Sequence, residues 1–114
     1  MRKMRFLLVA LCFAAALAAP GMAAPDGNMS VAAWAQEKCA RYSKAWDAIA
    51  PGFGIERLGD AFVTNHAAFL ESDCTLPANV CPRSAAELEM ANLLSLAALN
   101  AGMTGSFVPF ACRD

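Results

Sequence analysis

The segment at residues 74–87 reads CTLPANVCPRSAAE and contains a loop signal followed by a helix start. Pro77 and Pro82 cannot both be accommodated in one helix, because each lacks a backbone N–H and clashes with the preceding turn. Ser84 and Glu87 have the spacing of a capping box, in which the serine caps the first turn and the glutamate reaches back to it. The segment therefore predicts a cysteine-containing loop that leads into a helix.

A long helix is predicted upstream of this loop, over residues 31–50. Ser30 can cap its first turn, and the Pro51-Gly52 pair is expected to end it. Its apolar positions recur at steps of four and three and share one side: Ala35, Cys39, Tyr42, Trp46 and Ile49. Charged residues occupy the other side, so the pattern indicates an amphipathic helix.

Two more helices complete the prediction. Asp60 can cap a second helix over residues 60–72, and the third runs from the capping box to about residue 101, where Gly102 follows the last turn. Residues 103–114 are expected to form an extended tail. Because no alternating β pattern is present, the fold class is predicted to be all-α, a small three-helix domain with an extended C-terminal tail.

The first 23 residues have the pattern of a cleavable secretory signal peptide. Three basic residues lie at the start: Arg2, Lys3 and Arg5. An uncharged apolar run over residues 6–19 follows, and Gly21 and Ala23 stand at the −3 and −1 positions of a cleavage site. A 14-residue helix spans about 21 Å, less than the ~30 Å hydrocarbon core, so no membrane anchor is expected after cleavage.

Removal of residues 1–23 changes both the cysteine count and the charge of the chain. Cys12 leaves with the signal, and four cysteines remain: Cys39, Cys74, Cys81 and Cys112. The remaining chain has six basic and ten acidic residues, which gives a net charge of −4. This charge argues against nucleic-acid binding. We expect residues 24–29 to be a flexible leader and residues 30–114 to be a single domain with two disulfides, located in the periplasm or secreted.

The lengths of the predicted helices favour one of the three possible disulfide pairings. Cys39 lies about 16 Å before the turn between the first two helices, and Cys74 lies about 21 Å beyond it, near the same level. The tail can extend about 35 Å, enough to bring Cys112 back along the third helix to Cys81. We therefore predict Cys39–Cys74 and Cys81–Cys112. The rival pairing joins Cys74 to Cys81 and Cys39 to Cys112.

The third helix and the tail carry no charge between Glu89 and Arg113. One side of the helix is expected to face the core: Ala86, Met90, Leu93, Leu94, Ala97 and Ala101. The opposite side is apolar as well, and a helix that is apolar all round is usually covered. Either the tail or a partner, which is another protein or a second copy of the chain, covers that second side. The candidate interaction surface comprises Leu88, Leu96, Leu99, Phe107, Phe110 and Trp34.

No set of residues indicates catalysis, a metal or a cofactor. His66 is the only histidine, and its place beside the apolar stripe of the second helix predicts a packed or boundary side chain. The intervals between the four cysteines match no zinc-binding pattern. Acidic residues flank a loop and a helix start, where carboxylates are solvated or favoured by the helix dipole. The chain is therefore expected not to be an enzyme.

A small exported helical protein with these features fits a non-catalytic binding module, whose partner is another exported protein or a second copy. Two alternatives remain open. In its size, export, helices and Cys74-x-x-Pro77 motif, the chain is similar to the small periplasmic acid-stress chaperones, although it has an additional cysteine pair. That resemblance implies loosening of the helices at low pH. The other alternative is a carrier of a small apolar ligand between the helices.

Overall fold

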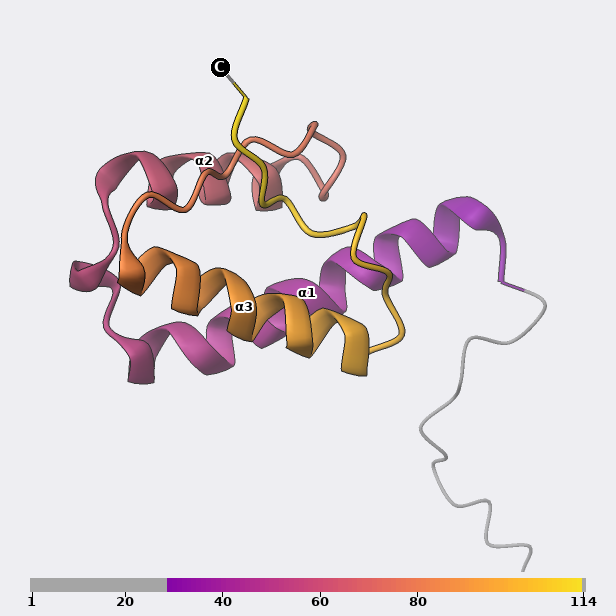
Figure 1. Ribbon diagram of the computed structural model, residues 1–114. Helices are drawn as coiled ribbons and strands as arrows, with labels where there is room; N and C mark the ends of the chain where they lie inside the picture. Colours follow the sequence, from indigo (N-terminus) through magenta and orange to yellow (C-terminus); the bar gives the residue numbers. More distant parts are fainter. Residues whose placement is uncertain (1–28, 114) are drawn as a thin grey trace, which may run out of the picture.

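The computed structural model describes residues 29–113, which form three α-helices and one short 3-10 helix (Figure 1). The elements are α1 (Val31–Phe53), η1 (Ile55–Arg57), α2 (Asp60–Glu71) and α3 (Ala85–Asn100). These helices and the absence of strands from the described part of the chain confirm the all-α prediction. The predicted signal peptide at residues 1–23 and nearly all of the leader at 24–29 lie outside the described residues.

The three helices enclose one core. Figure 1 shows α1 and α3 lying against each other in opposite directions, with α2 across from them. The loop after α2 returns along the domain to the start of α3, and the C-terminal tail passes back over the core. The largest fully buried side chains come from all of these parts: Tyr42, Phe62, His66, Val80, Met90, Leu94 and Pro109.

The first helix is longer than predicted. Pro51 does not end α1, which continues to Phe53 and is closed by Gly54 in a positive-φ conformation, with φ of 95°. Pro51 removes only one hydrogen bond, the one to the carbonyl of Asp47. Because Asp47 is exposed, water can satisfy that carbonyl, and the fixed φ of proline is compatible with a helix.

The second helix also begins differently from the prediction. Asp60 is the first residue of α2 rather than its cap, and Gly59 occupies the cap position without a side chain. The carboxylate of Glu87 holds the cap residue itself, since Oε2 accepts a hydrogen bond from the backbone N–H of Gly59 at 3.1 Å. A residue of α3 thereby fixes the start of α2.

The predicted boundaries of α3 agree with the structure to within one residue. Ser84 caps the helix by accepting a hydrogen bond from the N–H of Glu87 at 3.1 Å. At the other end Gly102 has φ of 89° and its N–H bonds to Leu99, while the N–H of Met103 bonds to Ala98. These two bonds form a Schellman motif, which satisfies the last carbonyls of the helix.

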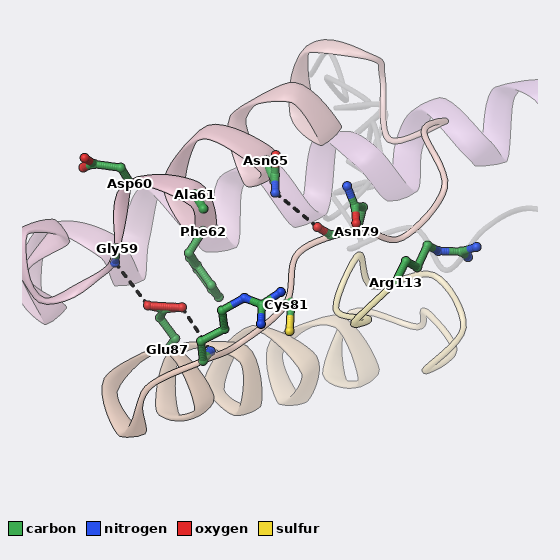
Figure 2. Close-up of a pocket in the computed structure, with 10 residues that line it drawn as sticks. Gly59, Asp60, Ala61, Phe62, Asn65, Asn79, Cys81, Glu87 and Arg113 are labelled. Atoms are coloured by element: carbon green, nitrogen blue, oxygen red, sulfur yellow. Dashed lines mark hydrogen bonds between the residues drawn. The ribbon is translucent and has the colours of Figure 1, made fainter.

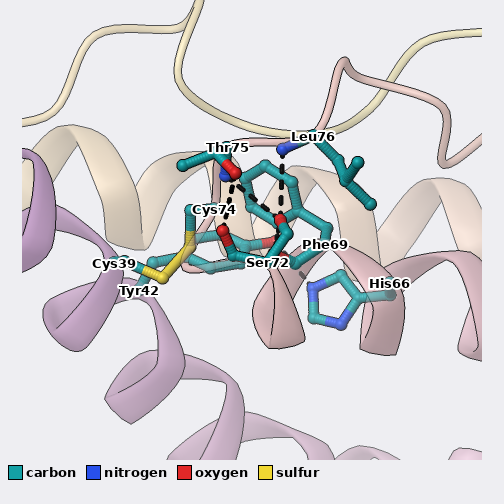
Figure 3. Close-up of a disulfide and its surroundings, with 8 residues drawn as sticks. All are labelled: Cys39, Tyr42, His66, Phe69, Ser72, Cys74, Thr75 and Leu76. Carbon is teal, nitrogen blue, oxygen red and sulfur yellow. Dashed lines mark hydrogen bonds between the residues drawn. A yellow bond between two sulfur atoms is a disulfide. The ribbon is translucent and has the colours of Figure 1, made fainter.

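Both predicted disulfides are present, and the rival pairing is wrong. Cys39 of α1 is bonded to Cys74, which lies three residues after the end of α2, and Figure 3 shows this bond beside Tyr42 and Phe69. Cys81 of the loop is bonded to Cys112 of the tail. Together the bonds connect α1 to α2 and the tail to the loop before α3. Disulfides are consistent with an oxidising, exported location.

Candidate binding surface

The tail does not run along α3, and this settles which part of the chain it covers. It turns at residues 104–107 and then pairs with the loop, where the N–H of Val80 bonds to Pro109 and the N–H of Ala111 bonds to Val80. The reason is the position of Cys81, which precedes α3 and draws Cys112 towards α2. Of the alternatives for covering the outer side of α3, the tail is therefore not the one that the structure shows.

The core-facing side of α3 is rotated by about 60° from the predicted one. The buried residues are Glu87, Met90, Ala91, Leu94 and Ala98. Leu93, which was expected to face the core, is 38% exposed. The side of α3 that packs against the rest of the domain includes the polar residue Glu87, whereas the prediction was based on apolar residues alone. The buried carboxylate of Glu87 could not be anticipated from that pattern.

The side of α3 opposite the core carries three strongly exposed leucines. Leu88, Leu96 and Leu99 are 53%, 59% and 54% exposed, respectively. With the exposed residues Ala85 and Asn92 they form a line that we call the outer stripe. At 3.6 residues per turn, all five positions lie within about 40° of Asn92 around the helix. Asn92 therefore lies at the centre of the stripe, with an apolar residue four and seven positions away on each side.

The outer stripe has one charged neighbour on its own helix. Glu89 lies at its edge and pairs with Arg57 of η1, with Nη2 and Oε2 3.5 Å apart. Residues 90–112 contain no charge. Leucines with this exposure and so few charges around them are unusual on a small monomer, in which contiguous apolar surface often marks an interaction site.

The predicted interaction surface contains three more residues, none of which belongs to α3: Phe107, Phe110 and Trp34. Phe107 and Phe110 are partly buried in the core cluster, where Phe107 contacts the ring of Tyr42 edge-on and Phe110 stacks on Phe62. Trp34 is half-buried on α1, beneath the guanidinium of Arg41. The six residues therefore do not form one surface.

Trp34 nevertheless adjoins one end of the outer stripe. A Cβ atom placed on Gly102 would lie 4.0 Å from its ring, and Arg41, which covers that ring, donates a hydrogen bond to the carbonyl of Ala101 at 3.0 Å. The indole is thus next to the C-terminal end of α3.

His66 is a core residue, in agreement with its predicted packing role. Its ring is 1% exposed, and Nε2 shares a hydrogen bond of 2.8 Å with the Tyr42 hydroxyl. The ring of Trp46 lies 4.2 Å away between centroids. Burial lowers the pKa of His66 to about 4, because the charged imidazolium would lose its hydration, and raises the pKa of Tyr42 for the equivalent reason. His66 is therefore neutral at pH 7 and is not presented to a substrate.

Two of the surface clefts border α2. One, of about 260 Å³, contains the Glu87 hydrogen bonds, as Figure 2 shows. Another, of about 510 Å³, is lined by apolar residues that include Phe69, Leu76 and Val80. Asn65 and Arg113 border both of these clefts. Arg113 bonds to the carbonyl of Ala78, so its guanidinium holds the tail end to the loop.

Within residues 29–113, no cluster of histidine, cysteine and carboxylate side chains has the composition of a metal site. None of the helices described is long and apolar enough to cross a membrane. No known family model matches the chain, and no curated protein or solved structure is significantly similar to it. The outer stripe is consequently the strongest candidate site that the residues themselves provide.

Proposed function

We propose that this protein is an exported, non-catalytic binding module that docks a protein partner through the outer stripe of α3. One observation carries the proposal: Leu88, Leu96 and Leu99 are each more than half exposed on the side of α3 that faces away from the core. Covering apolar surface is worth about 25 cal/mol for each Å² removed from water, so a partner with a matching apolar groove gains affinity there.

The location proposed for this activity is the periplasm or the extracellular space. The two disulfides support an oxidising compartment, and the pattern of residues 1–23 supports export. The net charge of −4 expected after cleavage disfavours nucleic acid as the partner. A protein with an apolar surface of its own remains the class that fits the stripe.

The proposal is tested by comparing two leucine substitutions in the native compartment. Leu96→Glu places a charge in the middle of the stripe without disturbing the core, because the side chain is exposed. Leu76→Glu is the matched control, since Leu76 is 47% exposed but lies in the loop after α2. Cross-linking in intact cells should give a defined complex with the wild type and Leu76→Glu, and at least a tenfold lower yield with Leu96→Glu. Equal yields from all three would contradict the proposal.

A second candidate function, an acid-responsive chaperone, is favoured by the surroundings of His66. The ring neighbours of His66 come from α1, α2 and the tail and are uncharged: Tyr42, Trp46, Phe62 and Phe110. Protonation at low pH would thus place an unpaired charge where three parts of the fold meet. Suppression of client aggregation should then be strong at about pH 3 and absent at pH 7. Equal activity at both values would contradict this second candidate.

A further inference from the structure

The outer stripe is symmetric in position about Asn92. Leu88 and Leu96 lie four residues before and after it, and Ala85 and Leu99 lie seven residues before and after it. Reversing the direction of the helix therefore exchanges exposed apolar positions with one another and leaves Asn92 in place. Such a stripe matches a second copy of itself when the two helices run antiparallel about a two-fold axis. A partner of another sequence would not require this arrangement.

We infer that the occupant of the outer stripe is a second copy of this chain, with the two α3 helices packed antiparallel about a two-fold axis at Asn92. The inference rests on the proposed function and specifies its partner. In this arrangement Leu88 faces Leu96 of the second copy, and Ala85 faces Leu99. The interface is isologous, so the same residues contribute from both sides and the assembly closes as a dimer.

Asn92 has the chemistry that the symmetric position needs. A carboxamide carries both a donor and an acceptor, so the two Asn92 side chains on the axis can hydrogen-bond to each other. A single asparagine within an apolar seam between helices fixes their register, because a register that pairs Asn92 with another position of the stripe leaves the amide opposite an apolar side chain. The polar residue at the centre of the stripe thus sets the alignment, and the leucines around it provide the buried apolar area.

The charges of the helix permit this contact. Glu89 lies three residues before Asn92, so its counterpart in the antiparallel copy is the uncharged Ser95. The carboxylate of Glu89 is also next to Arg57 of its own chain. A partner with a strongly charged surface would find no complementary charge along residues 90–100. A second copy, which presents the same uncharged seam, meets no such mismatch.

The size of the contact indicates a weak dimer. The 16 residues of α3 extend about 24 Å, and with a width of about 10 Å the contact footprint is about 250 Å² on each copy. A standard stable interface buries about 800 Å² on each partner. We therefore expect dissociation constants between about 10 µM and 1 mM, a range in which the local concentration of the protein controls assembly.

Cysteine cross-linking distinguishes this geometry from others. The full chain is expressed with its own N-terminus and purified oxidised from the periplasm of a bacterial host. Asn92→Cys should form a disulfide-linked dimer at least tenfold faster than Thr64→Cys, a control on the exposed side of α2. Leu88→Cys and Leu96→Cys should each react as slowly as the control when alone, because identical positions are offset by about 12 Å along the axis. An equimolar mixture of the two should react as fast as Asn92→Cys.

A charge exchange provides a second measurement without new cysteines. Asn92→Lys and Asn92→Glu each place like charges on the axis and should weaken self-association at least tenfold in sedimentation experiments. Mixing the two variants should restore a dimer. Rapid self-reaction of Leu88→Cys, or an Asn92→Cys rate equal to that of the control, would overturn the inference.

The two proposals fail in distinguishable ways. If the wild type remains monomeric at 1 mM, the second copy is not the partner. The binding-module proposal still stands in that case if Leu96→Glu abolishes a cellular complex that Leu76→Glu retains. If neither self-association nor a complex sensitive to Leu96→Glu is found, both proposals are wrong.

Discussion

The Tyr42 hydroxyl lies 2.8 Å from Nε2 of His66, and this hydrogen bond joins α1 to α2 within the aromatic core. Phe110 of the C-terminal tail also lies over the imidazole, with the two ring centroids 6.3 Å apart and nearly parallel. Three parts of the fold therefore depend on one ionisable side chain. Its protonation state links the pH of the compartment to the stability of the domain.

Folding stability should fall as the pH decreases from about 6.5 to about 4. The pKa of His66 is about 4 in the folded protein, whereas an exposed histidine has a pKa near 6.5, so only the unfolded chain binds the proton between these values. The loss is roughly 3 kcal/mol for a shift of this size, and it levels off below the folded pKa. Urea unfolding at pH 7, 5.5 and 4 measures it.

The control for this prediction removes the histidine and its partner in turn. His66→Phe should flatten the pH dependence over that range, although it leaves the buried Tyr42 hydroxyl unpaired and costs about 1–3 kcal/mol at pH 7. The double variant with Tyr42→Phe should recover part of that cost. An unchanged pH profile in His66→Phe would show that other groups cause the loss of stability.

Glu87 should be essential for stability, whereas Glu89, two residues away on the same helix, should not. The Glu87 carboxylate accepts hydrogen bonds from the N–H groups of Gly59 and Arg83 and from the Ser84 hydroxyl. Glu87→Ala removes the acceptor at two helix starts and should lower the free energy of unfolding by about 2–3 kcal/mol. Glu89→Ala breaks only an exposed ion pair and should change it by at most about 0.5 kcal/mol.

Urea unfolding of the two alanine variants, with equal m values, provides the comparison. Glu87→Gln is informative as well, because its amide presents one N–H₂ group to a backbone donor and should recover only part of the loss. If the two alanine variants were equally stable, the contacts of Glu87 would contribute nothing beyond those of an ordinary exposed carboxylate.

The contacts of Glu87 include one that the sequence predicts and one that it does not. The capping box predicted correctly that Ser84 caps α3, since the bond from the Glu87 N–H to Ser84 is local. The bond from Glu87 to Gly59 spans 28 residues and depends on how α2 and α3 meet, so no local pattern contains it. The disulfide pairing was predictable because helix lengths alone place Cys39 and Cys74 at one level.

The path of the tail was harder to predict, because it also depends on contacts between residues far apart in the sequence. The bond between Cys81 and Cys112 was predicted. The path that the tail takes to reach it depends on the side of α3 at which the loop arrives. Phe107 and Phe110 consequently lie in the core instead of covering the leucines. Exposure of Leu96 is thus a result of tertiary packing, while the spacing of the outer stripe was visible in the sequence.

The two disulfides should stabilise different parts of the domain by similar amounts. Their sequence separations are 35 and 31 residues, so the chain-entropy model assigns roughly 3.5–4 kcal/mol to each. The Cys81→Ala/Cys112→Ala variant should also speed hydrogen exchange at the N–H groups of Val80 and Ala111, which pair the tail with the loop.

The matched control is Cys39→Ala/Cys74→Ala, which should lose a similar amount of stability. In this variant the N–H groups of Val80 and Ala111 should exchange only through global unfolding, and not through local opening of the tail. Exchange followed by NMR at pH 6 reports each amide separately. If both variants accelerated tail exchange equally, the second disulfide would have no local effect on the tail.

Two glycine-to-alanine substitutions should have opposite effects. Gly102 has φ of 89°, a conformation that alanine adopts only with strain, so Gly102→Ala should lower the free energy of unfolding by about 1 kcal/mol or more. Gly52 lies inside α1 with no atom near the position of a new Cβ, so Gly52→Ala should raise it by about 0.5–1 kcal/mol. Thermal unfolding measures both changes. A loss of stability in Gly52→Ala would mean that α1 ends before Pro51, as its sequence alone suggests.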